Sequence, residues 1–284
     1  MIKEAELKAL VVLLEDDDEE VVSHAEKRLM EIGTQVIPWL EQEWESTFNP
    51  LIQRRIEDLI HTLQFELFQE RLIDWKDHRE GNLLEGLWLV ATYQYPDLDL
   101  EELNQEIHQL YVEVWREFRD DLAPFDQIRI INSSLFNKFK FRANTKNFHS
   151  PANSMINAVL ESKKGNPISL CAVYLLIAEK LNLPVYGVNL PNLFILMYKS
   201  EVMDFYINAF NKGLIFSKED IHNYLDHLNI PHEEIFYQPC SNLDIVLRSL
   251  RNLVVSFEKL GDYYKSDEIK MVLKRLDDKY IGFE

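Results

Sequence analysis

The chain has 284 residues, enough for one large domain or for two or three smaller ones. Its 30 basic and 48 acidic side chains give a net charge of −18, which argues against binding to nucleic acid or to anionic membrane surfaces. A hydrophobic content of 46% predicts packed cores, and two cysteines are too few for a disulfide framework, so a cytoplasmic location is expected. The N-terminus does not resemble a signal peptide, and the absence of any apolar run of about 18 residues predicts no membrane-spanning segment.

The acidic excess is concentrated in the first part of the chain. Residues 1–130 carry about 12 basic and 31 acidic side chains, whereas residues 131–284 carry about 18 and 17. Such a shift in composition indicates a domain boundary. We predict three domains, which are an acidic helical region at 1–127, an α+β core at 128–235 and a helical hairpin at 236–284.

The acidic region is predicted to be helical, because its apolar residues recur at helical spacing. The acidic run that begins at Asp16 can cap the second helix, Gly33 can end that helix, and Pro38 is typical of the start of the next one. This order resembles a HEAT-type helical repeat, and an irregular helical bundle is the alternative. Trp88 and Trp115 are expected to be core aromatics.

The middle of the chain changes to an α+β pattern. Residues 165–181 begin Gly-Asn-Pro-Ile-Ser-Leu-Cys and continue with almost uninterrupted apolar residues, which predicts a buried helix capped by Ser169. Strand-like stretches follow at 183–188, 194–198 and 203–207. A helix followed by an antiparallel sheet predicts a mainly α protein with an α+β core.

Cys171 is expected in the first turn of this buried helix. The positive end of a helix dipole stabilises a thiolate and lowers the pKa of a cysteine, which favours a reactive thiol. Free cysteine is also among the most buried residue types, so a purely structural role is the competing interpretation.

Several short motifs in this region resemble the SirB-like group of transglutaminase-like proteins. They are Asn153-Ser154, Gly165-Asn166-Pro167-Ile168-Ser169-Leu170, Pro191-x-x-Phe194 and Phe210-x-x-Gly213. The resemblance covers roughly residues 130–280. It implies a papain-like layout, with a cysteine at a helix start, a histidine on the next strand and an Asp or Asn on the strand after it. It also implies a tetratricopeptide-like tail.

The sequence departs from this pattern at the histidine. The group's Pro-Gly-His-Phe is replaced by a segment in which Leu193 stands at the histidine position, and a leucine side chain cannot transfer a proton. Asn208 stands at the Asp position and is a candidate cleft-lining group, while Ser169 competes with Cys171 for the nucleophile position. A thiol without a paired base is mostly protonated at neutral pH, so an efficient acyl-transfer enzyme is not expected.

Three functional hypotheses follow. The first is a non-catalytic module that binds a protein or peptide through the old cleft, with these binding residues: Asn153, Ser169, Asn192 and Leu193. The second is a hydrolase or acyltransferase that uses Cys171 with a relocated histidine, for which the candidates are His149, His222, His227 and His232. The third is a helical scaffold whose cleft is closed. No motif predicts a metal or another cofactor.

The C-terminal segment predicts a helical hairpin. Ser241 or Asn242 can cap its first helix, and a Gly-Asp-Tyr turn at Gly261 separates that helix from the second. The layout is that of one tetratricopeptide unit. Because solenoids need about three repeats, a single unit is expected to pack on the core as a cap rather than to bind peptides alone.

Overall fold

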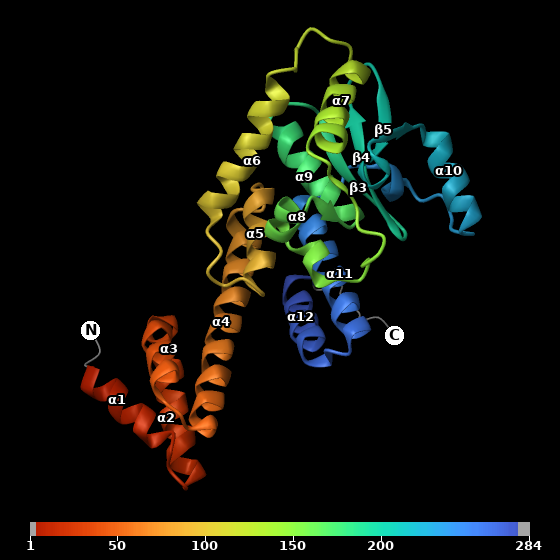
Figure 1. Cartoon of the computed structure of the whole chain (residues 1–284). Helices are drawn as coiled ribbons and strands as arrows, with labels where there is room; N and C mark the ends of the chain where they lie inside the picture. The colour runs from red at the N-terminus through yellow and green to blue at the C-terminus, as the bar shows by residue number, and fades with distance from the viewer. Residues whose placement is uncertain (1–3, 278–284) are drawn as a thin grey trace. The chain divides into compact units, whose positions relative to one another are not determined.

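The computed structural model describes residues 4–277 and divides into two compact units, with the boundary between Arg71 and Leu72 (Figure 1). The chain is mostly helical and carries a small antiparallel sheet, as the sequence predicts, and the sheet has four strands where three were expected. The predicted domain boundaries at 127/128 and 235/236 remain predictions.

The first unit is built from helices and one shared core. Its elements are α1 (Glu4–Leu13), α2 (Glu19–Ile32), the 3-10 helix η1 (Thr34–Val36), α3 (Ile37–Ser46) and the first part of α4 (Pro50–His78). The Asp18 side chain accepts a hydrogen bond from the Glu20 N–H at the start of α2. The buried side chains come from every one of these elements: Leu10, Leu14, Val22, Ala25, Leu29, Val36, Leu40, Ile52, Ile56, Leu59 and Leu63.

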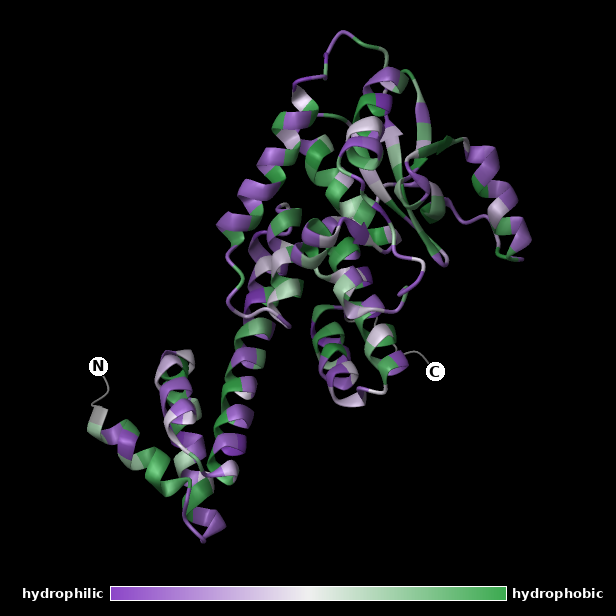
Figure 2. Cartoon of the chain, viewed as in Figure 1, coloured by the Kyte–Doolittle hydropathy of each residue, from purple (hydrophilic) through white to green (hydrophobic). Residues whose placement is uncertain are grey.

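The second unit is built around one buried helix, α9 (Pro167–Lys180). Figure 2 shows α9 as mostly hydrophobic, in keeping with its fully buried length from Ile168 to Ala178. The other helices of this unit are α5 (Leu83–Thr92), α6 (Leu100–Trp115), α7 (Pro124–Asn132), the π-helix η2 (Ser133–Lys138), η3 (Pro151–Ser154), α8 (Ile156–Ser162), η4 (Ala209–Asn211), α10 (Lys218–His227), η5 (Glu234–Tyr237), α11 (Asn242–Leu260) and α12 (Tyr263–Leu276).

The main sheet has the strand order β3-β4-β5-β6, and every neighbouring pair is antiparallel. The strands are β3 (Val185–Leu190), β4 (Leu193–Lys199), β5 (Asp204–Asn208) and β6 (Leu214–Phe216). A separate parallel pair joins β1 (Arg142–Ala143) to β2 (Lys164–Gly165). The first three strands of the sheet were predicted within two residues at each end, whereas β6 and the short parallel pair were missed.

Opposite faces of the sheet are covered by different helices. On one face, Ile221 and Leu225 of α10 join a buried cluster with alternate strand residues, which are Val188, Leu190, Ile195, Met197 and Tyr206. The residues between them face α9, because strand side chains alternate between the two faces. This alternation decides which side chains of β3 and β4 can reach the start of α9.

The predicted C-terminal hairpin forms from α11 and α12. Ser241 caps α11 in a reciprocal pair with Asp244, and Gly261 ends the helix with a φ of 78°. The helix α11 packs against α5, η3 and α9 as well as against α12. Trp115, predicted to be a core aromatic, is instead 58% exposed at the last position of α6.

Candidate functional site

The start of α9 is fixed by a capping box between Asn166 and Ser169. The Asn166 side-chain oxygen accepts from the Ser169 N–H at 2.9 Å, and the Ser169 hydroxyl accepts from the Asn166 N–H at 3.0 Å. The cap is therefore Asn166, and Ser169, which the sequence suggested as the cap, is the third helical residue. Because the helix begins at Pro167, Cys171 lies in its second turn rather than in its first.

The Cys171 thiol is enclosed in the core. Its side chain has an exposed fraction of 0%, and its sulfur donates to the Phe194 carbonyl oxygen at 3.6 Å. Burial raises the pKa of this thiol far above its ordinary value, and the hydrogen bond from the Ala209 N–H opposes that shift only in part. A nucleophilic thiolate is therefore disfavoured at this position.

Leu193 and Asn208 each precede a residue whose backbone bonds to the Cys171 thiol, but their own side chains make other contacts. Leu193 packs with the cluster on the α10 face of the sheet, whereas its neighbour Phe194 points to the α9 face. The Asn208 side chain accepts from the Asn211 N–H at 3.1 Å and so caps η4. Neither residue lines the cavity described next.

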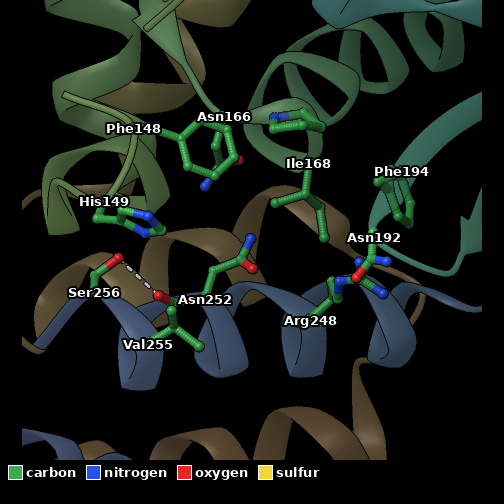
Figure 3. Close-up of a pocket in the computed structure, with 11 residues that line it drawn as sticks. Phe148, His149, Asn166, Ile168, Asn192, Phe194, Arg248, Asn252, Val255 and Ser256 are labelled. Carbon is green, nitrogen blue, oxygen red and sulfur yellow. Dashed lines mark hydrogen bonds between the residues drawn. The ribbon is translucent and has the colours of Figure 1, made fainter. Parts of the chain in front are cut away.

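A cavity of about 320 Å³ lies at the N-terminal end of α9 (Figure 3). Four separate segments of the second unit contribute to its wall, which is lined by Phe148, His149, Asn166, Pro167, Ile168, Asn192, Phe194, Arg248, Asn252, Val255 and Ser256. Of the residues predicted for the site, Asn192 lines this cavity. Asn153 and Ser169 do not line it, but each bonds to a residue that does, Phe148 and Asn166 respectively.

Asn153 holds the loop that carries Phe148 and His149. Its side-chain nitrogen donates to the carbonyl oxygens of Asn147 at 2.8 Å and Phe148 at 2.9 Å, and its oxygen accepts from the Asn144 side chain at 2.8 Å. The side chain has an exposed fraction of 2%. Asn153 is therefore a positioning residue for one wall of the cavity.

Arg248 supplies the positive charge of the cavity. One of its terminal nitrogens donates to the Asn189 side-chain oxygen at 2.7 Å. Burial lowers the pKa of this guanidinium, and the nearby Arg251 lowers it further. Among the described residues, no carboxylate lies within ion-pair distance of Arg248, whereas Arg251 pairs with Asp277 at 2.8 Å.

Sequence reasoning missed the contribution of α11. Arg248, Asn252 and Ser256 recur every four residues on a helix that otherwise buries apolar side chains. The four-residue spacing of these polar side chains could have indicated the site from the sequence. Polar side chains on an otherwise apolar helix face are expected to border solvent or a ligand.

The candidate histidines are dispersed. His149 lines the cavity and stacks edge-on against Phe148. His222 and His232 stack on each other at 4.7 Å between ring centroids, on the α10 side of the sheet. His227 bonds to the Asn223 carbonyl of its own helix. Among residues 4–277, no three His, Cys, Asp or Glu side chains are grouped as metal ligands.

Comparison with known families assigns this fold. The model of the transglutaminase-like superfamily matches residues 101–251, which is more than half of the chain and includes α9 and the main sheet. The chain belongs to the transglutaminase-like superfamily. The predicted transglutaminase-like core is therefore confirmed.

Proteins from bacteria and from a mammal show partial similarity to this chain. A UPF0162 protein from Xylella fastidiosa is 30% identical over 178 residues, covering 60% of this chain and 63% of the relative. UPF0162 protein YchA from Escherichia coli is 25% identical, covering 63% of this chain and 68% of the relative. F-box only protein 21 from Mus musculus is 33% identical, covering 46% of this chain and 26% of the relative.

The similarity to the Xylella relative spans less than two thirds of that protein's length. No solved structure matches the chain. Within the part of the chain that the structure describes, every helix is too short or too polar to cross a membrane.

Proposed function

We propose that this chain is a non-catalytic, SirB-like member of the transglutaminase-like superfamily that binds a peptide or an extended protein segment in the cavity at the start of α9. The observation that carries the proposal is the separation of thiol and cavity. Cys171 has no exposed surface, while the cavity at the start of the helix is lined by three asparagines, one guanidinium and several apolar side chains.

The lining chemistry supports a peptide as the ligand. The side-chain amides of Asn192 and Asn252 each offer two donors and one acceptor, which is the pairing that a peptide backbone requires. In the described part of the chain, neither amide bonds to another residue. A cavity of about 320 Å³ is large enough for one or two side chains with their backbone.

The second unit also supports the finer assignment to the SirB-like group. The hairpin α11–α12 stands where the tetratricopeptide-like tail of that group is expected, and α11 contributes Arg248, Asn252, Val255 and Ser256 to the cavity. The tail is therefore proposed as part of the binding site. Similarity to an F-box only protein also points to protein interactions. A cytoplasmic location belongs to the proposal and rests on the low number of cysteines.

Peptide binding can be tested on the full chain with an array of short synthetic peptides of varied sequence. Val255→Trp places a larger side chain into the cavity, and Leu260→Trp is the matched control because Leu260 is 65% exposed on the same helix and lies outside the cavity. We expect Val255→Trp to abolish the peptide signal and Leu260→Trp to retain it. Circular dichroism and the Tm of both variants show whether each has folded.

A parallel assay tests the absence of catalysis. The wild-type chain and Cys171→Ala are incubated with an activated ester and with a glutamine-containing peptide plus an amine. We expect no turnover above background in either protein. Peptide binding that survives Val255→Trp, or turnover that disappears in Cys171→Ala, would contradict the proposal; the second result would favour the cysteine-dependent enzyme.

A further inference from the structure

Arg248 is a half-buried cation whose structural partners are neutral. Its terminal nitrogen reaches the Asn189 side-chain oxygen at 2.7 Å and the Leu190 carbonyl oxygen at 3.5 Å. Arg251, one turn further along α11, is satisfied by Asp277. A guanidinium has five N–H donors, so most donors of Arg248 are not used by these contacts. Partly buried charge without a counter-charge is costly, and an anion in the cavity would remove that cost.

The surroundings of Arg248 add neutral donors to its charge. Asn192, in the turn between β3 and β4, and Asn252, one turn along α11, both line the same cavity as Arg248 (Figure 3). The N–H of Ile168 is in the first turn of α9, where no intrahelical acceptor exists, and Ile168 also lines the cavity. Around this cavity, Arg248 is joined by amide donors and His149, and no carboxylate lines the wall.

We propose that Arg248, with Asn192 and Asn252, forms a subsite for a single carboxylate of the peptide ligand. The proposal rests on the peptide-binding function proposed above and specifies what the cavity recognises. A planar guanidinium matches the two oxygens of a carboxylate in a bidentate pair. The carboxylate can come from a peptide C-terminus or from an acidic side chain.

The charge balance favours a carboxylate over a phosphate group. Arg248 is the one arginine or lysine that lines the cavity in the described part of the chain. A phosphorylated side chain carries about −1.5 to −2 charges at neutral pH, which one guanidinium does not neutralise.

The subsite can be tested on the full chain by NMR titration with glutarate, with glutaramide as the neutral control ligand and inorganic phosphate as the alternative anion. The signals to follow are the Arg248 Nε–H group and the side-chain amides of Asn192 and Asn252. We expect saturable shifts with glutarate, weaker shifts with phosphate and none with glutaramide. Arg248→Gln should weaken glutarate binding about tenfold or more, because it removes a charged hydrogen-bond pair.

Two further variants and two pairs of peptides complete the test. Arg248→Lys keeps the charge but loses the planar fork and should bind glutarate at an intermediate affinity, while Lys259→Gln, an exposed charge on the same helix outside the cavity, should bind as wild type. Acetyl-trialanine with a free or amidated C-terminus tests the C-terminal source. Acetyl-Ala-Glu-Ala-amide and its glutamine counterpart test the side-chain source. At least one charged peptide should bind more tightly than its neutral partner.

Equal shifts with glutarate and glutaramide, or glutarate binding unchanged in Arg248→Gln, would overturn the subsite. The experiments distinguish a failure of the carboxylate subsite from a failure of the peptide-binding function. Peptide binding that requires the cavity but ignores both the carboxylate and Arg248 would remove the subsite alone. Glutarate binding at Arg248 together with peptide binding that survives Val255→Trp would remove the peptide function and leave a site for small carboxylates.

Discussion

The two compact units differ in charge and in how their residues are brought together. The first, residues 1–71, carries 7 basic and 17 acidic side chains, and its buried residues form one cluster contributed by successive helices. The second, residues 72–284, carries 23 and 31 over three times the length, and its cavity is assembled from segments up to about a hundred positions apart. The family match, at residues 101–251, lies within the second unit.

The first unit can be predicted from local sequence patterns, whereas the cavity of the second unit depends on contacts between segments that are far apart in the sequence. Helical periodicity describes nearly all of the first unit, because the apolar stripes of its helices meet in one buried cluster. In the second unit, periodicity describes the elements but not the cavity, since the cavity depends on the loop at His149, the cap at Asn166, the turn at Asn192 and one face of α11. The predictions below test whether substitutions in the second unit have larger effects than substitutions in the first.

The largest expected effect concerns the two thiols of the second unit. Burial raises the pKa of Cys240 to about 12 from an ordinary value of 9.0, and it raises that of Cys171 further. A raised pKa leaves the thiol protonated, so at pH 8 Cys240 should be alkylated about 10³-fold more slowly than an ordinary cysteine. Its rate should rise about tenfold per pH unit up to the pKa.

Iodoacetamide labelling of the native chain, read by mass spectrometry on each cysteine peptide, measures these rates. Labelling in denaturant supplies the control, where both cysteines should react at the ordinary rate. Rapid alkylation of native Cys171 at neutral pH would contradict its burial and would reopen the enzyme hypothesis.

A second prediction tests the packing of the second unit at Gly213. Its φ is 75°, and a Cβ there would lie 2.1 Å from the Asn132 side-chain oxygen. Gly213→Ala should therefore lower the free energy of unfolding by about 3 kcal/mol, combining left-handed strain with a clash. Gly261→Ala is the matched control, with a φ of 78° and no atom within 4 Å, and should cost about 1 kcal/mol. Urea denaturation of both variants measures the difference, and equal losses would contradict the role of the clash.

The elements of the second unit were more predictable than its site. The buried helix, three strands and the C-terminal hairpin follow from apolar runs, caps and turns, which are local signals. Trp115 was predicted to be buried because helical spacing indicates the face of a helix on which a residue lies. The spacing does not show that this residue, at the end of α6, is exposed. The strand β6 was missed because its three residues are too few for a periodic signal.

The site depends on details that no local pattern carries. A cap assigned to Asn166 rather than to Ser169 moves Cys171 from the first turn of α9 into the second, and so from an accessible helix start into the core. The family motif identified Leu193 at the histidine position, but the face on which it lies follows from strand register. Arg248 and Asn252 come from α11, whose contact with α9 is a property of the tertiary fold.

A third prediction compares buried and exposed asparagines. Asn153→Ala removes three hydrogen bonds in the second unit and should lower the free energy of unfolding by about 2 kcal/mol, because two loop carbonyls and one amide lose their partner. It should also weaken peptide binding, since Phe148 and His149 line the cavity. Asn49→Ala in the first unit removes an exposed hydrogen bond to the Leu51 N–H and should cost about 0.5 kcal/mol.

Chemical denaturation and the peptide array together check this pair. If Asn153→Ala loses peptide binding while its Tm is unchanged, the Asn153 side chain contacts the ligand rather than stabilising the loop. A larger loss of stability in Asn49→Ala than in Asn153→Ala would reverse the comparison between the two units.

The last prediction concerns a helix cap of the first unit. Asp18→Ala removes the oxygen that accepts from the Glu20 N–H at 2.9 Å, and a lost cap costs about 1 kcal/mol or less when water can replace it. Asp18→Asn keeps the acceptor and removes the charge, so it separates capping from the interaction with the helix dipole. If capping dominates, Asp18→Asn should retain most of the stability that Asp18→Ala loses, and added salt should leave the difference unchanged. If the charge dominates, both variants should lose stability equally at low salt and approach wild type at high salt, which would make the acidic run an electrostatic feature of this unit rather than a capping one.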